Sequence, residues 1–240
     1  MRTLVVLPTY NEIANIEKML RALRSEVSEC DILVVDDGSP DGTADVADRV
    51  GDELQQITVL RRGGKGGLGS AYRAGFTWGL EQGYDRFVEI DCDFSHDPRA
   101  LRDMLQLGER YEVVIGSRYV PGGAIPSWST SRLLLSKGGN RYASFMLGLG
   151  VADATAGFRV YTKSALEKID YQTVRADGYG FQIEMTYRAR TGGATIAEHP
   201  ISFTDRTEGE SKMSRAIVTE ALWMVTKWGL ARFVGRSPRP

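Results

Sequence analysis

The chain has 240 residues, of which 42% are hydrophobic and 25% charged, so its composition is ordinary for a soluble globular protein and its length suits one large domain. A formal net charge of −1 excludes a general electrostatic attraction to nucleic acid or anionic lipid, and two cysteines exclude a disulfide framework. The sequence shows neither a signal peptide nor an apolar run near the roughly 20 residues that span a bilayer, so we expect a cytoplasmic protein.

Short apolar runs alternate with amphipathic stretches along the first half of the chain. The runs predicted as strands are residues 3–7, 31–36, 57–60, 86–91 and 111–117. The stretches predicted as helices between them are residues 13–23, 43–50, 70–80 and 98–108. Near-continuous apolar strands separated by helices indicate a mostly parallel sheet with helices on both faces. The predicted fold class is therefore α/β, with one Rossmann-like domain.

The second half has a less regular pattern. The predicted elements there are a helix over 129–150, a strand over 156–161, a helix over 181–190 and a strand over 194–203. We expect one domain over residues 1–213, followed by an amphipathic helix and tail over 214–240. One face of that helix carries apolar residues, namely Ile217, Val218, Ala221, Leu222, Val225 and Trp228. Trp223 and Lys227 lie near the other side, so packing on the core and contact with lipid headgroups both fit.

Loops that follow the carboxyl ends of parallel strands line the binding crevice of such a sheet. Five loops hold these positions and all are rich in polar residues or glycine. They are PTYNE (8–12), DDGSPDGT (36–43), RRGGKGGLG (61–69), DCDFSHDP (91–98) and SRYVPGG (117–123). We therefore expect the chemistry of the protein to lie at this edge of the sheet.

The loop after the second strand begins with two carboxylates, Asp36 and Asp37. A carboxylate at the end of a strand can accept hydrogen bonds from a ribose or a base. Capping of the next helix by Asp41 or Thr43 explains the same residues without a ligand. Both interpretations stay open from this loop alone.

The glycine-rich loop reads G-x-G-x-x-G at Gly64, Gly66 and Gly69, which mimics a dinucleotide-binding fingerprint. That fingerprint belongs in the first βα turn, whereas this loop follows the third strand. Lys65 lies within the loop, and no Lys-Ser or Lys-Thr pair follows at the spacing of a P-loop. The loop fits phosphate binding, and a flexible turn is the plain alternative.

Two carboxylates, Asp91 and Asp93, stand one residue apart after the fourth apolar run. Residues i and i+2 of a strand face the same way, so the two groups converge unless the chain turns at once. Converging carboxylates indicate a hard cation such as Mg²⁺ or Mn²⁺ that bridges them to phosphate oxygens. The alternative is a pair of solvated loop acids. His96 fits either a supporting role beside the metal or the start of a helix.

Basic side chains recur without matching acids in the second half. They are Arg118, Arg132, Lys137, Arg159, Arg206 and Lys212. If several of them face the crevice, they form a second anion site beyond the metal, and otherwise they are surface charges.

Taken together, these motifs resemble those of the family 2 glycosyltransferases of GT-A fold, and among them the polyprenyl-phosphate (dolichyl-phosphate) mannose synthases. The motifs that carry the resemblance are LPTYNE, VVDDGSPDGT, GKGGLGSAY, DCDFSHDP, GSRY, GFRVY, GYGFQIEM and PISFTDRTEGESKM. They extend from residue 4 to residue 213, and their joint occurrence is highly specific.

The resemblance implies transfer of mannose from GDP-mannose to a polyprenyl monophosphate, with inversion to a β-linked product. Related enzymes that transfer glucose or aminoarabinose share the first half of the pattern, and the segments GYGFQIEM and DRTEGESK favour mannose. The main alternative is a polyprenyl-phosphate glucosyltransferase that uses UDP-glucose, and a distant one is a non-catalytic nucleotide-binding module. A Rossmann dehydrogenase is disfavoured by the misplaced glycines.

The resemblance also implies roles for individual residues. Those implied to hold the guanosine are Pro8, Tyr10, Glu12 and Asp37, with Lys65 and Asp91 framing its base or ribose. Asp91 and Asp93 would bind Mg²⁺ or Mn²⁺ on the diphosphate, and Ser95 stands where some relatives have a glutamine beside the metal. The lipid phosphate would bind to Arg118, Arg132 and Ser136, and Arg206 would bridge the charges of donor and acceptor.

The implied substrate also places the protein at a membrane. Many relatives continue into C-terminal transmembrane helices, whereas this sequence stops at GRSPRP. It resembles the members that use an amphipathic surface or a separate anchoring protein. We therefore expect peripheral association with the cytosolic face of a membrane.

Overall fold

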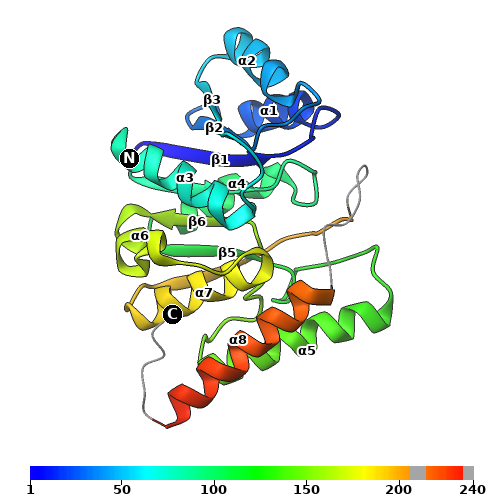
Figure 1. Ribbon diagram of the computed structural model, residues 1–240, viewed down its shortest axis with the longest axis vertical. Helices are drawn as coiled ribbons and strands as arrows, with labels where there is room; N and C mark the ends of the chain where they lie inside the picture. The colour runs from blue at the N-terminus through cyan, green and yellow to red at the C-terminus, as the bar shows by residue number, and fades with distance from the viewer. Residues whose placement is uncertain (206–214, 235–240) are drawn as a thin grey trace.

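A seven-stranded β-sheet runs through the computed structural model, which describes residues 1–205 and 215–234 (Figure 1). The strands are β1 (Thr3–Thr9), β2 (Asp31–Asp36), β3 (Ile57–Arg61), β4 (Arg86–Glu89), β5 (Val113–Ser117), β6 (Arg159–Thr162) and β7 (Ile196–Pro200). Their order across the sheet is β3-β2-β1-β4-β6-β5-β7. Strand β6 runs antiparallel to both of its neighbours, and the other pairings are parallel. The sheet is therefore mostly parallel, as the sequence predicts.

Helices cover both faces of this sheet. They are α1 (Ile16–Glu26), α2 (Thr43–Leu54), α3 (Leu68–Glu81), α4 (Leu101–Leu107), α5 (Thr130–Leu147), α6 (Lys163–Ile169), α7 (Gly178–Thr191) and α8 (Arg215–Phe233). Alternate residues of β1 enter two separate cores, because successive side chains of a strand point to opposite faces. Val5 and Leu7 belong to the core that includes buried residues of α1, α2 and α4, whereas Leu4 and Val6 belong to the core that includes buried residues of α3, α5, α6, α7 and α8.

Two elements depart clearly from the sequence prediction. Strand β4 ends at Glu89, two residues early, so Asp91 and Asp93 lie on a turn and not on the strand. Helix α6, of seven residues, was not predicted. Its start does carry a capping signal, since the Thr162 side chain accepts a hydrogen bond from the Ala165 N–H at 3.2 Å.

Helix α8 packs on the core through one face, as the apolar spacing predicts. Its buried residues include Ala221, Met224, Val225 and Trp228, and the Trp228 ring lies 5.6 Å from that of Tyr187 on α7. Leu222 was expected on this face and is instead 43% exposed. The side chains of Ile217 and Val218 lie outside the described residues.

Close packing of α3 on the sheet depends on a glycine. A Cβ added at Gly79 would lie 2.5 Å from Phe87 Cε1 and 2.6 Å from Leu4 Cδ2, which are fully buried core side chains. An alanine here must push the helix away from β1 and β4. The distance between α3 and the sheet therefore requires a residue without a side chain.

A buried polar contact joins the end of β4 to α7. The Glu89 carboxylate is fully buried and accepts a hydrogen bond from Gln182 Nε2 at 2.9 Å. The nearby Arg159 is equally buried, and its guanidinium donates to neutral oxygens such as those of Ala154 and Thr186. Burial raises the pKa of Glu89 to about 8, against the opposing charge of Arg159. Glu89 is therefore mostly protonated at neutral pH.

We expect Gly79→Ala to lower the free energy of unfolding by up to about 2 kcal/mol. Overpacking in a core costs about 1–3 kcal/mol, and the helix propensity of alanine returns about 1 kcal/mol. Gly139→Ala in α5 is the matched control, because nothing lies within 4 Å of an added Cβ there. Urea unfolding should show the control unchanged or more stable. Equal effects of both substitutions would contradict the close packing of α3.

Glu89→Gln should reduce the loss of stability that we expect between about pH 5.5 and pH 8.5. The folded protein holds the Glu89 proton up to a pKa of about 8, whereas the unfolded chain releases it near 4.5, so stability falls as pH rises through this window. The loss can reach about 3 kcal/mol in wild type and should largely vanish in the variant. Urea unfolding at the two pH values measures it.

Glu112→Gln is the control for this pH effect. The ion pair with Lys168 lowers the pKa of Glu112 to about 2, so its titration lies below the measured window. The pH dependence of this control should match that of wild type. A Glu89→Gln variant with the wild-type pH dependence would mean that Glu89 is ionised and paired with Arg159.

Candidate functional site

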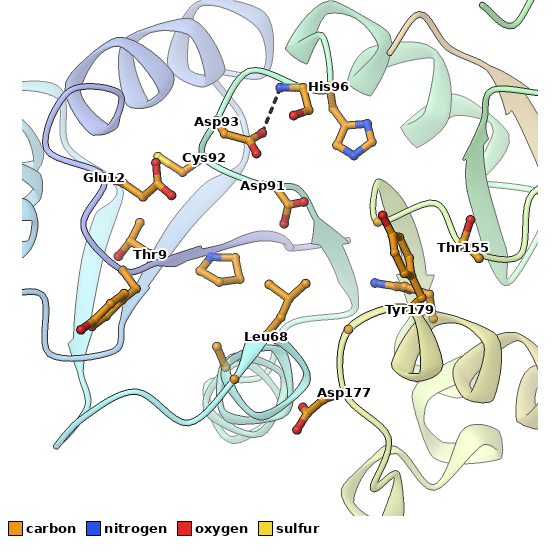
Figure 2. Close-up of a pocket in the computed structure, with 18 of the residues that line it drawn as sticks. Thr9, Glu12, Leu68, Asp91, Cys92, Asp93, His96, Thr155, Asp177 and Tyr179 are labelled. Atoms are coloured by element: carbon orange, nitrogen blue, oxygen red, sulfur yellow. Dashed lines mark hydrogen bonds between the residues drawn. The ribbon is translucent and has the colours of Figure 1, made fainter. Parts of the chain in front are cut away.

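A cavity of about 650 Å³ lies at the edge of the sheet where the parallel strands have their carboxyl ends. Its lining comes from the loops after β1, β2, β3, β4 and β5, as the sequence predicts. It also comes from the loop before β6, the start of α5 and the start of α7. In Figure 2, Asp91, Asp93 and Glu12 lie on one side of this cavity, and Thr155 and Tyr179 lie on the other.

The loops after β2 and β3 are held together by Asp37. Its carboxylate accepts hydrogen bonds from Arg62 Nη1 at 2.7 Å and from the Gly66 N–H at 2.9 Å. Arg62 also donates to Ser70 at the start of α3. This contact fixes the glycine-rich loop at the cavity wall, so the loop is an ordered part of the site and not a free turn.

Tyr10 and Lys65 face each other across this end of the cavity. The Lys65 ammonium lies 4.7 Å from the centre of the Tyr10 ring, close enough for a cation–π contact. An aromatic face, an ammonium and the Asp37 carboxylate suit a planar base with a ribose beside it. Asp41 has a structural role, because it accepts hydrogen bonds from the N–H groups of Thr43 and Ile13 and so joins two loops.

The two central carboxylates line the cavity from a tight turn. Phe94 holds a positive φ of 57°, and the Ser95 N–H donates to Asp93 Oδ1 at 2.9 Å. Asp91 Oδ1 accepts from the Tyr72 hydroxyl at 3.2 Å. Burial and the charge of Asp91 together raise the pKa of Tyr72 well above its usual value, so this hydroxyl remains a donor. Neither carboxylate lies on strand β4, so the alternation of side chains along a strand is not the reason that they converge. Both nevertheless line the cavity.

His96 lies at the cavity floor and does not begin a helix. Its ring packs 5.5 Å from Phe158 and 5.3 Å from Phe203, and its Nδ1 atom is buried without a hydrogen-bond partner among the described residues. Burial lowers the pKa of His96 to about 4, against the opposing charge of Asp93. The imidazole is therefore neutral at neutral pH.

Two lining residues on α7 were not predicted as site residues. Asp177 and Gln182 belong to the first turns of this helix, within and beside the motif GYGFQIEM. Gln182 Oε1 is buried without a hydrogen-bond partner among the described residues, and a Cβ added at Gly157 would lie 4.0 Å from Gln182 Nε2 and 3.6 Å from Asp91 Oδ2. The motif GYGFQIEM contributes to the family resemblance, but no periodicity or charge pattern in the sequence predicts that α7 lines the crevice.

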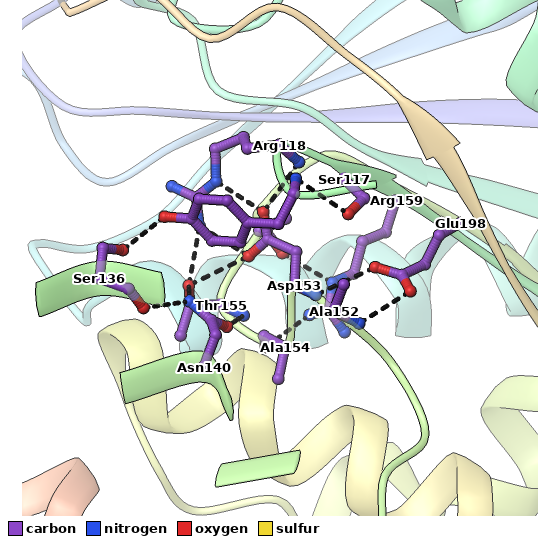
Figure 3. Close-up of polar contacts among 12 residues, drawn as sticks. Ser117, Arg118, Ser136, Asn140, Ala152, Asp153, Ala154, Thr155, Arg159 and Glu198 are labelled. Carbon is purple, nitrogen blue, oxygen red and sulfur yellow. Dashed lines mark hydrogen bonds and ion pairs between the residues drawn. The ribbon is translucent and has the colours of Figure 1, made fainter. Parts of the chain in front are cut away.

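Arg118 is fixed by an extended polar network at the opposite end of the cavity (Figure 3). Its guanidinium donates to both carboxylate oxygens of Asp153, at 2.6 and 2.7 Å, and to Thr155 Oγ1 at 2.8 Å. Burial alone would raise the pKa of Asp153, but the hydrogen bonds and charge of Arg118 outweigh it and hold that pKa below its usual value. Glu198 on β7 accepts from the N–H groups of Ala152 and Asp153, which fixes the same loop.

Arg132 lies at the opening of the cavity, at the same end as Arg118. Its guanidinium stacks 3.9 Å from the centre of the Trp128 ring and donates to Asp205 at 3.1 Å. Trp128 Nε1 donates to the same carboxylate at 2.8 Å. Arg132 is partly exposed, so its guanidinium remains open to an incoming anion.

The other predicted basic residues do not join this group. Arg159 is buried in the core, and Lys137 lines a second cavity. Ser136 does not line the main cavity, and its hydroxyl accepts a hydrogen bond from Tyr119 at 2.6 Å. Arg206 and Lys212 lie outside the described residues.

The charges around the cavity are unbalanced. The described lining contains six carboxylates and three cations, which are Glu12, Asp37, Asp91, Asp93, Asp177 and Asp205 against Lys65, Arg118 and Arg132. A site with this excess repels phosphate groups unless a cation joins it. No cluster of three or more metal-ligating His, Cys, Asp or Glu side chains occurs among the described residues. The arrangement suits a hard cation that takes its remaining ligands from phosphate and water.

Comparison with known proteins supports the same interpretation. The family model described as glycosyl transferase family 2 matches residues 4–170. An undecaprenyl-phosphate mannosyltransferase of Micrococcus luteus is 51% identical over 96% of this chain and 95% of its own length. A polyprenol monophosphomannose synthase of Mycolicibacterium smegmatis is 46% identical over 98% of this chain and 90% of its own length.

Solved structures share the fold at low sequence identity. Glucosyl-3-phosphoglycerate synthase of Mycobacterium tuberculosis, solved with Mn²⁺ and UDP, has a TM-score of 0.63 at 21% identity and is matched over 81% of its chain. A mannosyltransferase of Pyrobaculum calidifontis, solved with GDP-mannose and Mn²⁺, has a TM-score of 0.64 at 16% identity and is matched over 66% of its chain. Both matches cover all of this chain and confirm the predicted GT-A type of α/β fold. With the relatives above, they lead to one conclusion: the chain belongs to glycosyl transferase family 2, among the polyprenyl-phosphate mannose synthases.

Proposed function

We propose that this protein transfers mannose from GDP-mannose to a polyprenyl monophosphate with inversion, giving polyprenyl-phosphate β-mannose and GDP. The observation that carries the proposal is the arrangement of one cavity. The Asp91–Asp93 pair lies between a base-binding end at Tyr10 and Lys65 and an arginine end at Arg118 and Arg132. A nucleotide sugar and a phosphate acceptor need these two ends on either side of the reacting atoms.

The acceptor does not require a catalytic base. A phosphate monoester is largely dianionic near neutral pH, because its second pKa is about 6. An acceptor oxygen forms a bond to the anomeric carbon while the bond from that carbon to GDP breaks, and GDP leaves with the electron pair. No proton is transferred in this step. The neutral His96, which lines the cavity, fits a site that orients hydroxyl groups by hydrogen bonds.

Asp91 and Asp93 are the residues that would hold Mg²⁺ or Mn²⁺. The excess of carboxylates in the lining fits a bound cation, and two carboxylates suffice where substrate phosphates supply other ligands. A divalent cation bound there offsets the charge that develops on the departing diphosphate. The protein's own contribution is to hold the two carboxylates on the turn that Phe94 and Ser95 form.

The arginine end lowers the repulsion between the two anionic substrates. Arg118 is rigid and partly neutralised by Asp153, so it orients the acceptor more than it attracts it. Arg132 is open at the mouth and supplies the attraction. Its stacking on Trp128 holds the guanidinium plane in place without using its N–H donors.

A transfer assay tests the proposal directly. The purified protein is incubated with Mn²⁺, a short polyprenyl phosphate and radiolabelled GDP-mannose, with UDP-glucose in parallel. We expect lipid-linked label from GDP-mannose alone. Label from UDP-glucose alone would keep the fold and the metal site and would overturn the donor. A chain that binds GDP but transfers nothing would favour a nucleotide-binding module.

Asp91→Asn should lower the transfer rate by at least about 100-fold, because loss of a metal ligand removes several kcal/mol of transition-state stabilisation. Chelation of divalent metal from the wild type should have the same effect, and added Mn²⁺ should restore it. Asp97→Asn is the matched control, since Asp97 is in the same loop but does not line the cavity; it caps a short 3-10 helix (Pro98–Ala100) and pairs with Arg99. Wild-type activity in Asp91→Asn would disprove the metal assignment.

Arg132→Ala should raise the KM for polyprenyl phosphate by about 10-fold or more, because a charge-assisted hydrogen bond contributes about 1.5–3 kcal/mol. GDP affinity should stay unchanged. Arg61→Ala is the control, because Arg61 pairs with Asp45 and Asp48 on α2, away from the arginine end. A loss confined to GDP affinity would show that the acceptor site lies elsewhere.

A further inference from the structure

A small polar space lies inside the main cavity, beside Gly157. Apart from the neighbouring residues of the chain, the three heavy atoms nearest to a Cβ added at Gly157 are all polar. They are Asp91 Oδ2 at 3.6 Å and the Nε2 atoms of Gln182 and His96 at 4.0 Å. All four residues line the cavity, and we call the space between them the Gly157 niche.

The fold does not itself require a glycine at position 157. Gly157 does not have a positive φ, so an alanine can adopt its backbone conformation. Contacts of 3.6 and 4.0 Å are ordinary van der Waals distances, so an alanine side chain also fits among the protein's own atoms. Gly79 differs, because an added Cβ there meets core side chains at 2.5 and 2.6 Å. The missing side chain at Gly157 therefore leaves room for something other than the protein.

Gln182 and His96 have hydrogen-bonding capacity that the protein does not use. Both residues are 2% exposed, and Gln182 Oε1 and His96 Nδ1 have no hydrogen-bond partner in the part of the chain that the structure describes. One N–H of Gln182 Nε2 donates to Glu89, which leaves the second N–H for another acceptor. Buried polar atoms are nearly always hydrogen-bonded, so these side chains point to a polar occupant of the niche.

The walls of the niche are fixed by Arg159. Its buried guanidinium donates to the carbonyl oxygens of Ala154 and Ala156 at 2.8 and 2.7 Å, on the loop that carries Gly157 (Figure 3). It also donates to the carbonyl oxygen of Gln182 at 3.2 Å, on α7. One side chain thus holds the loop and the helix that border the niche. Groups held in this way discriminate between ligands, because they cannot move aside to accept a different one.

A hydroxyl group matches the polar atoms around the niche. It can donate to Asp91 Oδ2 and accept from Gln182 Nε2, because a hydroxyl is both a donor and an acceptor. The Asp91 carboxylate would repel a phosphate oxygen, and none of the three nearest polar atoms belongs to a lysine or an arginine. A cation would meet the amide hydrogens of Gln182. The niche therefore suits a neutral group that can donate and accept at once.

From these observations we infer that the Gly157 niche receives one hydroxyl group of the transferred sugar, and that Gly157 and Gln182 select the donor through it. The inference rests on the proposed function, because it names the part of that site that contacts the sugar. Asp91 borders both the niche and the place proposed for the diphosphate, so a sugar joined to that diphosphate reaches the niche. A donor without this hydroxyl leaves the buried Gln182 amide unpaired, which strongly disfavours it.

Transfer from donors that lack one hydroxyl tests the inference. The probes are GDP-mannose and its four deoxy analogues, each without the hydroxyl at C2, C3, C4 or C6. Gly157→Ala should lower kcat/KM for GDP-mannose about 10- to 100-fold, because the added methyl group takes the place of the hydroxyl. With one of the four analogues, Gly157→Ala and the wild type should be equally active, since that donor has no hydroxyl to place in the niche.

Gln182→Leu should show the same pattern with the same analogue. This variant also removes the hydrogen-bond partner of Glu89, so an unchanged GDP affinity checks that it is folded. Gly157→Ala keeps the inference testable if Gln182→Leu does not fold, because its added Cβ makes only ordinary contacts. A loss in Gly157→Ala that is the same with all five donors would overturn the inference, and so would wild-type activity with GDP-mannose.

Two substitutions outside the cavity are the matched controls. Gly139→Ala adds the same methyl group where nothing lies within 4 Å of it, and Gln106→Leu makes the same exchange at an exposed position of α4. Both controls should keep the wild-type kcat/KM with all five donors. A control that reproduces the pattern of Gly157→Ala would also overturn the inference.

Binding measurements separate this inference from the proposed function. Titration calorimetry with Mn²⁺ gives the affinities for GDP and for GDP-mannose. Gly157→Ala should weaken the binding of GDP-mannose at least about fivefold and leave that of GDP unchanged. A wild type with this binding pattern that transfers nothing would overturn the proposed function and support the niche. A wild type that transfers mannose, with equal changes in both affinities on Gly157→Ala, would overturn the niche alone.

Discussion

Repulsion between like charges is the constraint on which the site depends. Two anionic substrates must meet in a cavity whose described lining already has more carboxylates than cations. The fold solves this problem by position, because it holds Asp91 and Asp93 between two ends of different character. At one end Asp37 is occupied by Arg62 and the Gly66 N–H, and at the other Arg118 is occupied by Asp153.

These pairings distinguish residues that shape the site from residues that remain available to substrates. Arg118 and Asp153 form an ion pair that is almost completely buried. Removing either one would therefore leave an uncompensated buried charge. Arg132 stays at the surface and stacks on Trp128.

The sequence predicts the end of the cavity at Tyr10 and Lys65 better than the end at Arg118 and Arg132. Tyr10, Asp37, Lys65 and Asp91 follow parallel strands, and the rule that such loops line a crevice places them correctly. Thr155 and Gln182 were missed because they belong to the loop before an antiparallel strand and to a helix start, and no local pattern reveals either location. Charge alone also did not separate Arg118, which lines the cavity, from Arg159, which is buried in the core.

The antiparallel strand β6 has a consequence for the order in which the molecule assembles. Strands β1 to β4 pair with one another soon after each is synthesised, whereas β5 has only β6 and β7 as neighbours in the sheet. Strand β5 must therefore wait more than 40 residues for its first partner, since it ends at Ser117 and β6 begins at Arg159. Non-local pairings of this kind form late in folding. A nascent chain then acquires the end of its cavity at Tyr10 and Lys65 first, and the end at Arg118 and Arg132 closes only when synthesis is nearly complete.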